Sequence, residues 1–243
     1  MQIRTLENFE RIDELKRERR LARRRKRRNK LLWHIALSSA IVVIILSIAA
    51  VWLKTEADEQ AAAQANVLKM KIEKAPDIAQ ELLTINEYSR PGTPLEEVKG
   101  IVVHYTGNPG TTAMQNRNYF EGLAESKTTS ASSHYIIGLS GEIIQCVPLN
   151  EIAYASNHRN ADTISIECCI NNDAGKFSEK TYNSLVHLTA WLVGEYDLKI
   201  DDIIRHYDVT GKACPKYFVE HESAWVDFKL DVENYINTKG VKK

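Results

Sequence analysis

The sequence has no net charge, no visible internal repeat and only four cysteines. With 243 residues it is also too short for two full-sized domains with separate cores. These absences leave one globular domain with additional segments. The neutral total hides an uneven distribution: residues 1–30 contain 13 Lys and Arg against 5 Asp and Glu, a net of +8, and the rest contain 19 against 27, a net of −8. The two parts are expected to face different surroundings.

Charged residues are missing altogether between Leu31 and Leu53. As a helix this segment would be about 34 Å long at 1.5 Å per residue, which is enough to cross a bilayer. Trp33 and Trp52 lie near its two ends, where indole rings favour the headgroup region, and the arginine-rich flank Arg17–Lys30 lies only before it. The pattern predicts a single-pass transmembrane signal-anchor helix at residues 31–53, with the basic segment 1–30 in the cytoplasm and the remainder outside it.

Three other interpretations of these segments are less favoured. A cleaved signal peptide has an apolar core of about 7–15 residues behind a short basic start, whereas this run is longer and begins later. A buried core helix without a polar face would need a larger protein around it. Basic runs also bind nucleic acid, but the position of this one, directly before the span, is explained by anionic membrane lipid, so we expect no nucleic-acid partner.

The segment after the span has the composition of a stalk. Residues 56–74 are rich in Ala, Glu, Gln and Lys, with apolar residues at helical spacing until Pro76. Two prolines and a glycine within residues 88–94 mark a loop. We therefore predict a helical stalk and linker at residues 54–95 and a folded domain at residues 96–240.

Strand-like and helical patterns alternate in residues 96–240, which predicts an α/β or α+β domain around one sheet. A hairpin is expected around Ser140 and Gly141. The expected strands are 100–106, 133–137, 142–147 and 163–170, and the expected helices are 112–125, one after Ser178 and one containing Trp225 and Ile236.

Four residues of this domain have the chemistry of a metal-dependent site: His104, Glu167, His206 and Cys214. A catalytic zinc typically has three protein ligands and an open position for water, and the two histidines and the cysteine can supply them. Each signal is weak alone, since a single His in a strand is more often packed or exposed than a ligand. The glycine three residues before Cys214 and the proline after it allow a short loop to bring Cys214 to His206.

Four sequence blocks then occur in order. They are Ile-Val-Val-His104-Tyr-Thr-Gly-Asn-Pro, Ser-Ser-His134-Tyr-Ile-Ile, Thr-Ile-Ser-Ile-Glu167-Cys and His206-Tyr-Asp-Val-Thr-Gly-Lys212-Ala-Cys214-Pro. Together they resemble the signature blocks of the zinc-dependent N-acetylmuramoyl-L-alanine amidases of phage and bacillus lysins, which are related to the peptidoglycan recognition proteins. The resemblance covers residues 96–235, and four ordered blocks are far more specific than one. It implies a central mixed β-sheet flanked by helices, with the metal in an open groove.

The resemblance also implies the site and the reaction. Zn²⁺ would be held by His104, His206 and Cys214, with Glu167 and Lys212 as the catalytic pair. The reaction would be hydrolysis of the amide bond between N-acetylmuramic acid and L-alanine in peptidoglycan, by metal-activated water, with Glu167 as general base and Lys212 stabilising the oxyanion. Taken singly, the glutamate could be a solvated strand residue and the lysine a surface cation.

The second block supplies His134 and Tyr135 as candidate substrate contacts. The chain departs from the family in two places. Ser133 stands where some members have a catalytic tyrosine, which leaves more of the proton transfer to Glu167. Ala153-Tyr154-Ala155 replaces a Trp-His pair of many bacillus members, which leaves the groove wall and the preferred muropeptide open.

Three functions are compatible with these features. The first is a peptidoglycan hydrolase held at the cell membrane, on the cell-wall side; Cys214 beside both histidines favours it. The second is a non-catalytic peptidoglycan-recognition module tethered to the membrane, and the third is a scaffold whose stalk recruits partners. For the other cysteines, a bridge from Cys146 to Cys168 or Cys169 and a role as small buried hydrophobes both remain open. The oligomeric state does not follow from the sequence.

Overall fold

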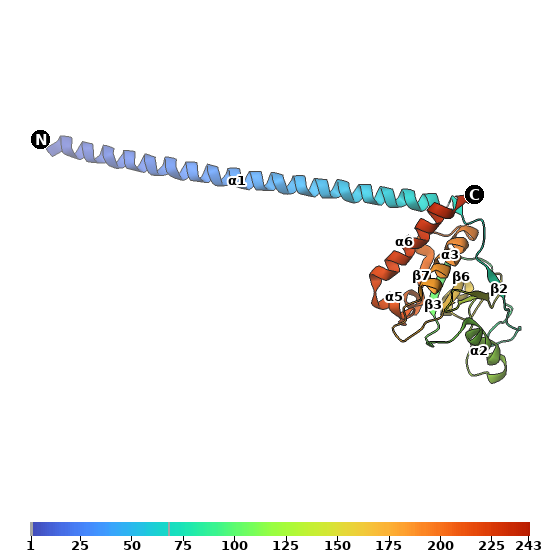
Figure 1. Cartoon of the computed structure of the whole chain (residues 1–243). Coiled ribbons are helices and arrows are strands. Elements are labelled where there is room, and N and C mark those ends of the chain that lie inside the picture. The colour runs from blue at the N-terminus through green and yellow to red at the C-terminus, as the bar shows by residue number, and fades with distance from the viewer. Residues whose placement is uncertain (1, 68) are drawn as a thin grey trace. The chain divides into compact units, whose positions relative to one another are not determined.

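The computed structural model describes residues 2–67 and 69–243, and the chain divides into two compact units, Met1–Ala61 and Ala62–Lys243. Helix α1 (Gln2–Val67) contains the uncharged apolar run (Figure 1). Among the described residues, one stretch, within Lys16–Ala63, has the length and mean hydropathy of a membrane span. Its apolar side chains, such as those of Ile44 and Leu46, are exposed. Helix α1 is therefore a candidate membrane anchor.

The second unit is built on a six-stranded mixed sheet in the order β2-β5-β4-β6-β3-β7. Every neighbouring pair is parallel except β4 and β5, which form the expected hairpin. Strands β3 and β6 are rich in β-branched residues and largely buried, as is typical of central parallel strands. The strands are β2 (Ile78–Gln80), β3 (Gly100–Tyr105), β4 (Tyr135–Ile137), β5 (Ile143–Gln145), β6 (Thr163–Cys168) and β7 (Ile203–Arg205).

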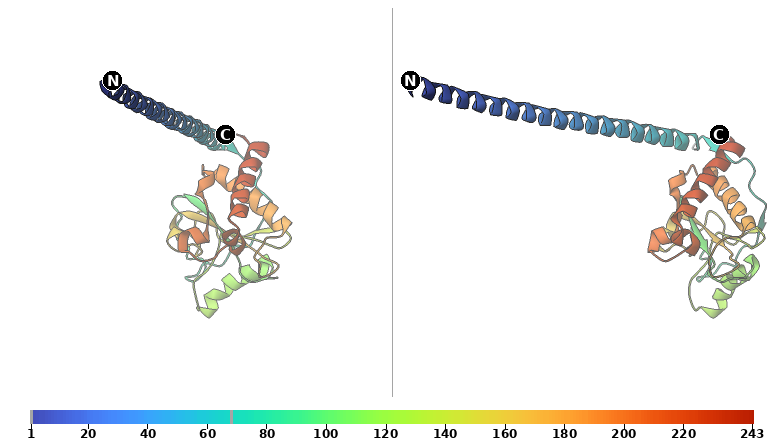
Figure 2. Two further views of the ribbon diagram at one scale, coloured as in Figure 1. Left: turned by 90° about the vertical axis from the view of Figure 1, so that its left-hand side faces the viewer. Right: turned by 60° about the vertical axis from the view of Figure 1, so that its left-hand side comes forward.

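Helices cover both faces of this sheet, which confirms the predicted fold class. On one face, Leu188 and Phe228 pack into the larger core, and on the other Phe120 and Leu123 pack into a second core. Figures 1 and 2 show the corresponding separation of the helices, with α2 apart from α3 and α6. The helices are α2 (Ala113–Ser126), α3 (Glu179–Glu195) and α6 (Glu222–Lys239), and the shorter elements are β1 (Met70–Lys71), η1 (Asn157–Ala161), η2 (Ile200–Asp202), α4 (His206–Thr210), α5 (Lys216–Glu220) and β8 (Val241–Lys242).

The folded unit begins earlier than the predicted boundary at residue 96. Helix α1 ends at Val67, and β2 extends the central sheet at its edge. Leu83 is 1% exposed in the core beside α2, and β1 pairs with β8 at the other end of the domain. The predicted linker therefore belongs partly to the domain. Strands of two or three residues carry no periodicity that the sequence could reveal.

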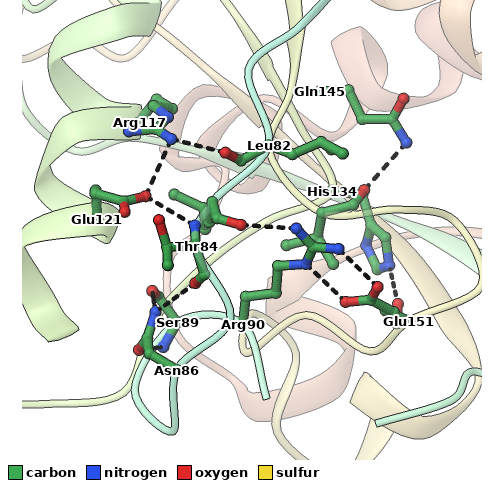
Figure 3. Close-up of polar contacts among 12 residues, drawn as sticks. Leu82, Thr84, Asn86, Ser89, Arg90, Arg117, Glu121, His134, Gln145 and Glu151 are labelled. Carbon is green, nitrogen blue, oxygen red and sulfur yellow. Dashed lines mark hydrogen bonds and ion pairs between the residues drawn. The ribbon is translucent and has the colours of Figure 1, made fainter. Parts of the chain in front are cut away.

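A polar network holds residues 81–90 against the sheet (Figure 3). Arg90 donates two hydrogen bonds of 2.8 Å to the Glu151 carboxylate and one of 2.7 Å to the carbonyl of Leu83. These hydrogen bonds hold the pKa of Glu151 below its ordinary value. The carbonyl of Glu151 in turn accepts a hydrogen bond of 2.9 Å from Nε2 of His134. The ion pair between Arg90 and Glu151 is largely shielded from water. It therefore fixes residues 81–90 more firmly than a surface ion pair would.

All four cysteines are buried and free. Cys168 belongs to the core beside α3 and α6, whereas Cys169 and Cys146 belong to the core beside α2. Cys168 and Cys169, which are neighbours at the end of β6, thus face opposite sides of the sheet. Neither candidate bridge is formed, and the three cysteines outside the candidate metal site serve as small buried hydrophobes.

Candidate active site

Two adjacent parallel strands bring the first pair of candidate residues together. His104 in β3 is paired in register with Glu167 in β6, so their side chains project from the same face. Nδ1 of His104 lies 3.9 Å from Oε1 of Glu167. The histidine is 1% exposed, while the glutamate side chain is 18% exposed. The glutamate side chain is therefore partly exposed and lies beside a buried ring.

A short loop brings the second pair together. Helix α4 starts at His206, directly after β7, and ends at Thr210; the capping residue Gly211 has a φ of 76°, in the left-handed region that favours glycine. The N–H of Tyr207 then donates a hydrogen bond of 2.8 Å to the carbonyl of Cys214. This contact closes the loop, so the cysteine returns to the histidine as the sequence predicts.

The three candidate ligands converge on one point. Their donor atoms all lie within 4.8 Å of one another. Sγ of Cys214 is 3.9 Å from Nδ1 of His104, and the rings of His104 and His206 are 4.6 Å apart between centroids. Nε2 of His206 is buried and has no hydrogen-bond partner among the described residues.

This cluster fits a zinc ion. Nitrogen and sulfur ligands lie about 2.0–2.3 Å from zinc, which places the ligand atoms of a tetrahedral site about 3.5 Å apart. A cation would also satisfy the unpartnered nitrogen of His206. Burial lowers the pKa of His104 well below its ordinary value, so the ring is neutral, as ligation requires. Burial raises the pKa of Cys214 to about 12, and a bound cation is what ionises a coordinating thiol.

Glu167 and Lys212 flank the cluster. Burial raises the pKa of Glu167 to about 7, and the positive charge of Lys212 opposes that shift. Oε2 of the glutamate is buried without a hydrogen-bond partner in the described chain, so it can take up a proton or a ligand. Lys212 is exposed and lines the same groove. A carboxylate and an ammonium thus stand beside three metal-type donors.

A groove of about 570 Å³ opens onto these five residues. Helix α2 contributes Asn116 and Tyr119 to its lining, and the chain before β6 contributes Tyr154, Asn157 and Asn160. The sequence indicated a groove wall at residues 153–155 but gave no signal for the asparagines or for Tyr119. They occupy segments without a motif and reach the groove only through tertiary packing.

His134 and Tyr135 do not line this groove, which corrects their assignment as substrate contacts. His134 is 1% exposed, and both its ring nitrogens are engaged: Nδ1 accepts from the N–H of Ser165 at 3.0 Å, and Nε2 donates to the carbonyl of Glu151. Tyr135 is 1% exposed in the core beside α3. The second block contributes to the interior because β4 lies inside the sheet.

Fold and site together define a class of protein: a mixed α/β domain with an open-sided His-His-Cys centre and a carboxylate beside it, the arrangement of metal-dependent hydrolases. The family model described as N-acetylmuramoyl-L-alanine amidase matches residues 94–217. The chain belongs to this family, which confirms the resemblance seen in the sequence blocks.

Individual proteins agree with this assignment. N-acetylmuramoyl-L-alanine amidase CwlL of Bacillus licheniformis is 34% identical over 68% of this chain and 49% of its own length. N-acetylmuramoyl-L-alanine amidase BlyA of Bacillus subtilis (strain 168) is 34% identical over 66% of this chain and 48% of its length. The solved catalytic domain of XlyA matches with 26% identity and a TM-score of 0.54, over 65% of this chain and 99% of that one. The chain thus spans about half the length of the curated relatives but almost the whole of a relative's catalytic domain.

Proposed function

We propose that this protein is a membrane-anchored zinc amidase that hydrolyses the amide bond between N-acetylmuramic acid and L-alanine in peptidoglycan. The observation that carries the proposal is the convergence of His104, His206 and Cys214 within 4.8 Å, beside a half-buried Glu167, in a domain of the amidase family. The names of the relatives CwlL and BlyA support the same reaction.

The two histidines and Cys214 would hold the ion. When bound, zinc supplies Lewis acidity, which acidifies a water molecule and polarises the amide carbonyl. The neutral ring of His104 and the buried thiol of Cys214 are the donors that such an ion selects. The groove leaves one side of the cluster open for the substrate.

Glu167 would move the proton. Its carboxylate accepts the proton of the attacking water and passes it to the departing nitrogen, for which the unpartnered Oε2 is available. The raised pKa, about 7, suits a group that must both take and release a proton near neutrality. Lys212 would place a positive charge beside the developing oxyanion.

The first unit would anchor the protein in the membrane, and the second would carry out catalysis. Helix α1 would span the cell membrane at residues 31–53, with the basic residues 1–30 in the cytoplasm next to anionic lipid. The amidase domain would then act on the cell-wall side. Peptidoglycan and membrane lipid are the two partners that this arrangement requires.

Digestion of purified peptidoglycan tests the proposal. The wild-type protein should release stem peptides with a free L-alanine amino terminus, detected by mass spectrometry. Cys214→Ala should lose bound zinc and activity together. Glu167→Gln should keep its zinc while its rate falls by about 10²–10⁴-fold, because the proton acceptor is lost.

The same experiment separates the alternative functions. A wild-type protein that binds zinc and peptidoglycan but releases no peptide would be a recognition module. Release of peptide by Cys214→Ala at the wild-type rate would contradict the proposed metal site.

A further inference from the structure

The outer nitrogen of His104 has a protein partner. Nδ1 faces Cys214 and Glu167, and Nε2, on the other side of the ring, lies 3.1 Å from Oγ of Ser156. Both His104 and Ser156 are 1% exposed, so water does not compete for the contact. Ser156 comes from the chain before β6, 52 residues away from His104 in sequence.

The contact is compatible with the form of the ring that binds metal through Nδ1. A neutral imidazole carries one N–H donor and one acceptor nitrogen. Ligation through Nδ1 requires a lone pair there, which leaves the proton on Nε2, where it is donated to Oγ of Ser156. The opposite tautomer would direct an N–H at the position that the metal needs. The serine hydroxyl thus gives the metal-binding form of His104 a partner for its Nε2 proton and holds the ring in place.

Ser156 is itself held in place. The backbone N–H groups of Ala155 and Ser156 both donate to Oδ1 of Asn160, at 3.1 and 2.5 Å. Asn160 lies in η1, so a turn of 3₁₀ helix fixes the backbone that carries the hydroxyl. Sequence gave no hint of this support, because neither residue belongs to one of the four blocks.

We propose that Ser156 is a positioning residue of the metal centre, which fixes the ring orientation of His104 through its Nε2, and that Asn160 holds Ser156 in place. This inference rests on the metal site of the proposed function. Groups that hydrogen-bond the outer nitrogen of a ligating histidine typically change metal affinity by about 10–100-fold. Here a serine hydroxyl takes this role.

Zinc affinity provides the test, measured on the full chain in detergent by competition with a chromophoric chelator. Ser156→Ala should bind zinc about 10–100-fold more weakly. Ser156→Thr, which retains the hydroxyl, should restore affinity to near the wild-type value. Ser133→Ala is the matched control, because Ser133 is 0% exposed, its hydroxyl donates to the carbonyl of Tyr135, and it does not line the groove.

Two results of this comparison would overturn the proposal. One is an unchanged zinc affinity in Ser156→Ala. The other is an equal loss in Ser133→Ala, which would assign the effect to general packing. Failure of the wild-type chain to bind zinc would instead contradict the proposed function, so the two failures are distinguishable.

A second measurement needs no variant. In the wild-type chain labelled with ¹⁵N-histidine, nitrogen chemical shifts report which nitrogen of each ring is protonated. With zinc bound, His104 should show a protonated Nε2. A protonated Nδ1 in the zinc-loaded protein would place the metal on Nε2 and refute the role of Ser156 even if Ser156→Ala failed to fold.

Discussion

His134 makes the stability of the domain sensitive to acid. Burial lowers its pKa to about 4. The unfolded chain, with a pKa near 6.5, therefore binds more protons between pH 6.5 and 4, so the stability contributed by the neutral ring is complete above pH 6.5 and is lost as the pH falls. The loss should reach about 3 kcal/mol across this window. Urea unfolding at pH 7.5 and 4.5 measures it.

His134→Gln is the control for this effect. The variant should be less stable at pH 7.5, because hydrogen bonds to Ser165 and Glu151 are lost. It should also lose less stability on acidification than the wild type. Equal losses in the two proteins would show that other groups dominate the pH dependence.

At the scale of single residues, sequence was a good guide to the candidate ligands and a poor guide to their surroundings. His104, Glu167, His206 and Cys214 belong to ordered blocks, and each block can be recognised from a few neighbouring residues of the sequence. Ser156 and the asparagines of the groove depend on segments that meet only in the folded chain. His134 shows the converse: it belongs to a block, but it directly precedes β4 and is buried in the interior.

At the scale of elements, α3 and β1 lie so close together that no side chain fits between them at Gly194. A Cβ added at Gly194 would lie 2.9 Å from Cα of Lys71, a backbone atom that cannot move aside cheaply. Gly194→Ala should therefore destabilise the domain by about 1–2 kcal/mol, because the clash outweighs the gain of about 1 kcal/mol in helix propensity. Thermal or urea unfolding measures the change.

Gly122 in α2 is the matched control. It is exposed, and an added Cβ would meet no atom within 4 Å. Gly122→Ala should stabilise the domain by about 0.5–1 kcal/mol through helix propensity alone. If Gly194→Ala stabilised the domain by a similar amount, the close approach of α3 to β1 would be refuted.

Helices were easier to predict than short strands. The hydroxyls of Thr112 and Ser178 cap α2 and α3, and both helices lie within a residue or two of their predicted starts. The edge strand β2 has three residues and follows a proline, so neither length nor alternation marks it. The order of strands in the sheet depends on contacts between distant segments, which no local pattern encodes.

At the scale of the whole molecule, the boundaries of the second unit define a truncation test. A chain starting at Ala62 keeps β1, β2 and the partners of Glu151, and should fold with one cooperative transition and bind zinc. A chain starting at Glu96 loses β2 and Arg90, leaving the Glu151 carboxylate without its partner. It should melt at a lower temperature or aggregate.

Circular dichroism and the yield of soluble protein measure this difference. Equal melting temperatures would show that residues 62–95 are dispensable. In cell fractionation, the full chain should sediment with membranes and the chain starting at Ala62 should not, because α1 carries the candidate span.

The pairing of β3 with β6 has a consequence for how the site can change. Because side chains alternate along a strand, slippage of β6 by one residue would turn Glu167 into the hydrophobic interior and present Ile166 or Cys168 to the groove. The hydrogen bonds between these strands thus also set the position of Glu167 relative to His104. An insertion or deletion within either strand would separate the two side chains and abolish the proposed hydrolysis, even if every side chain of the site were retained.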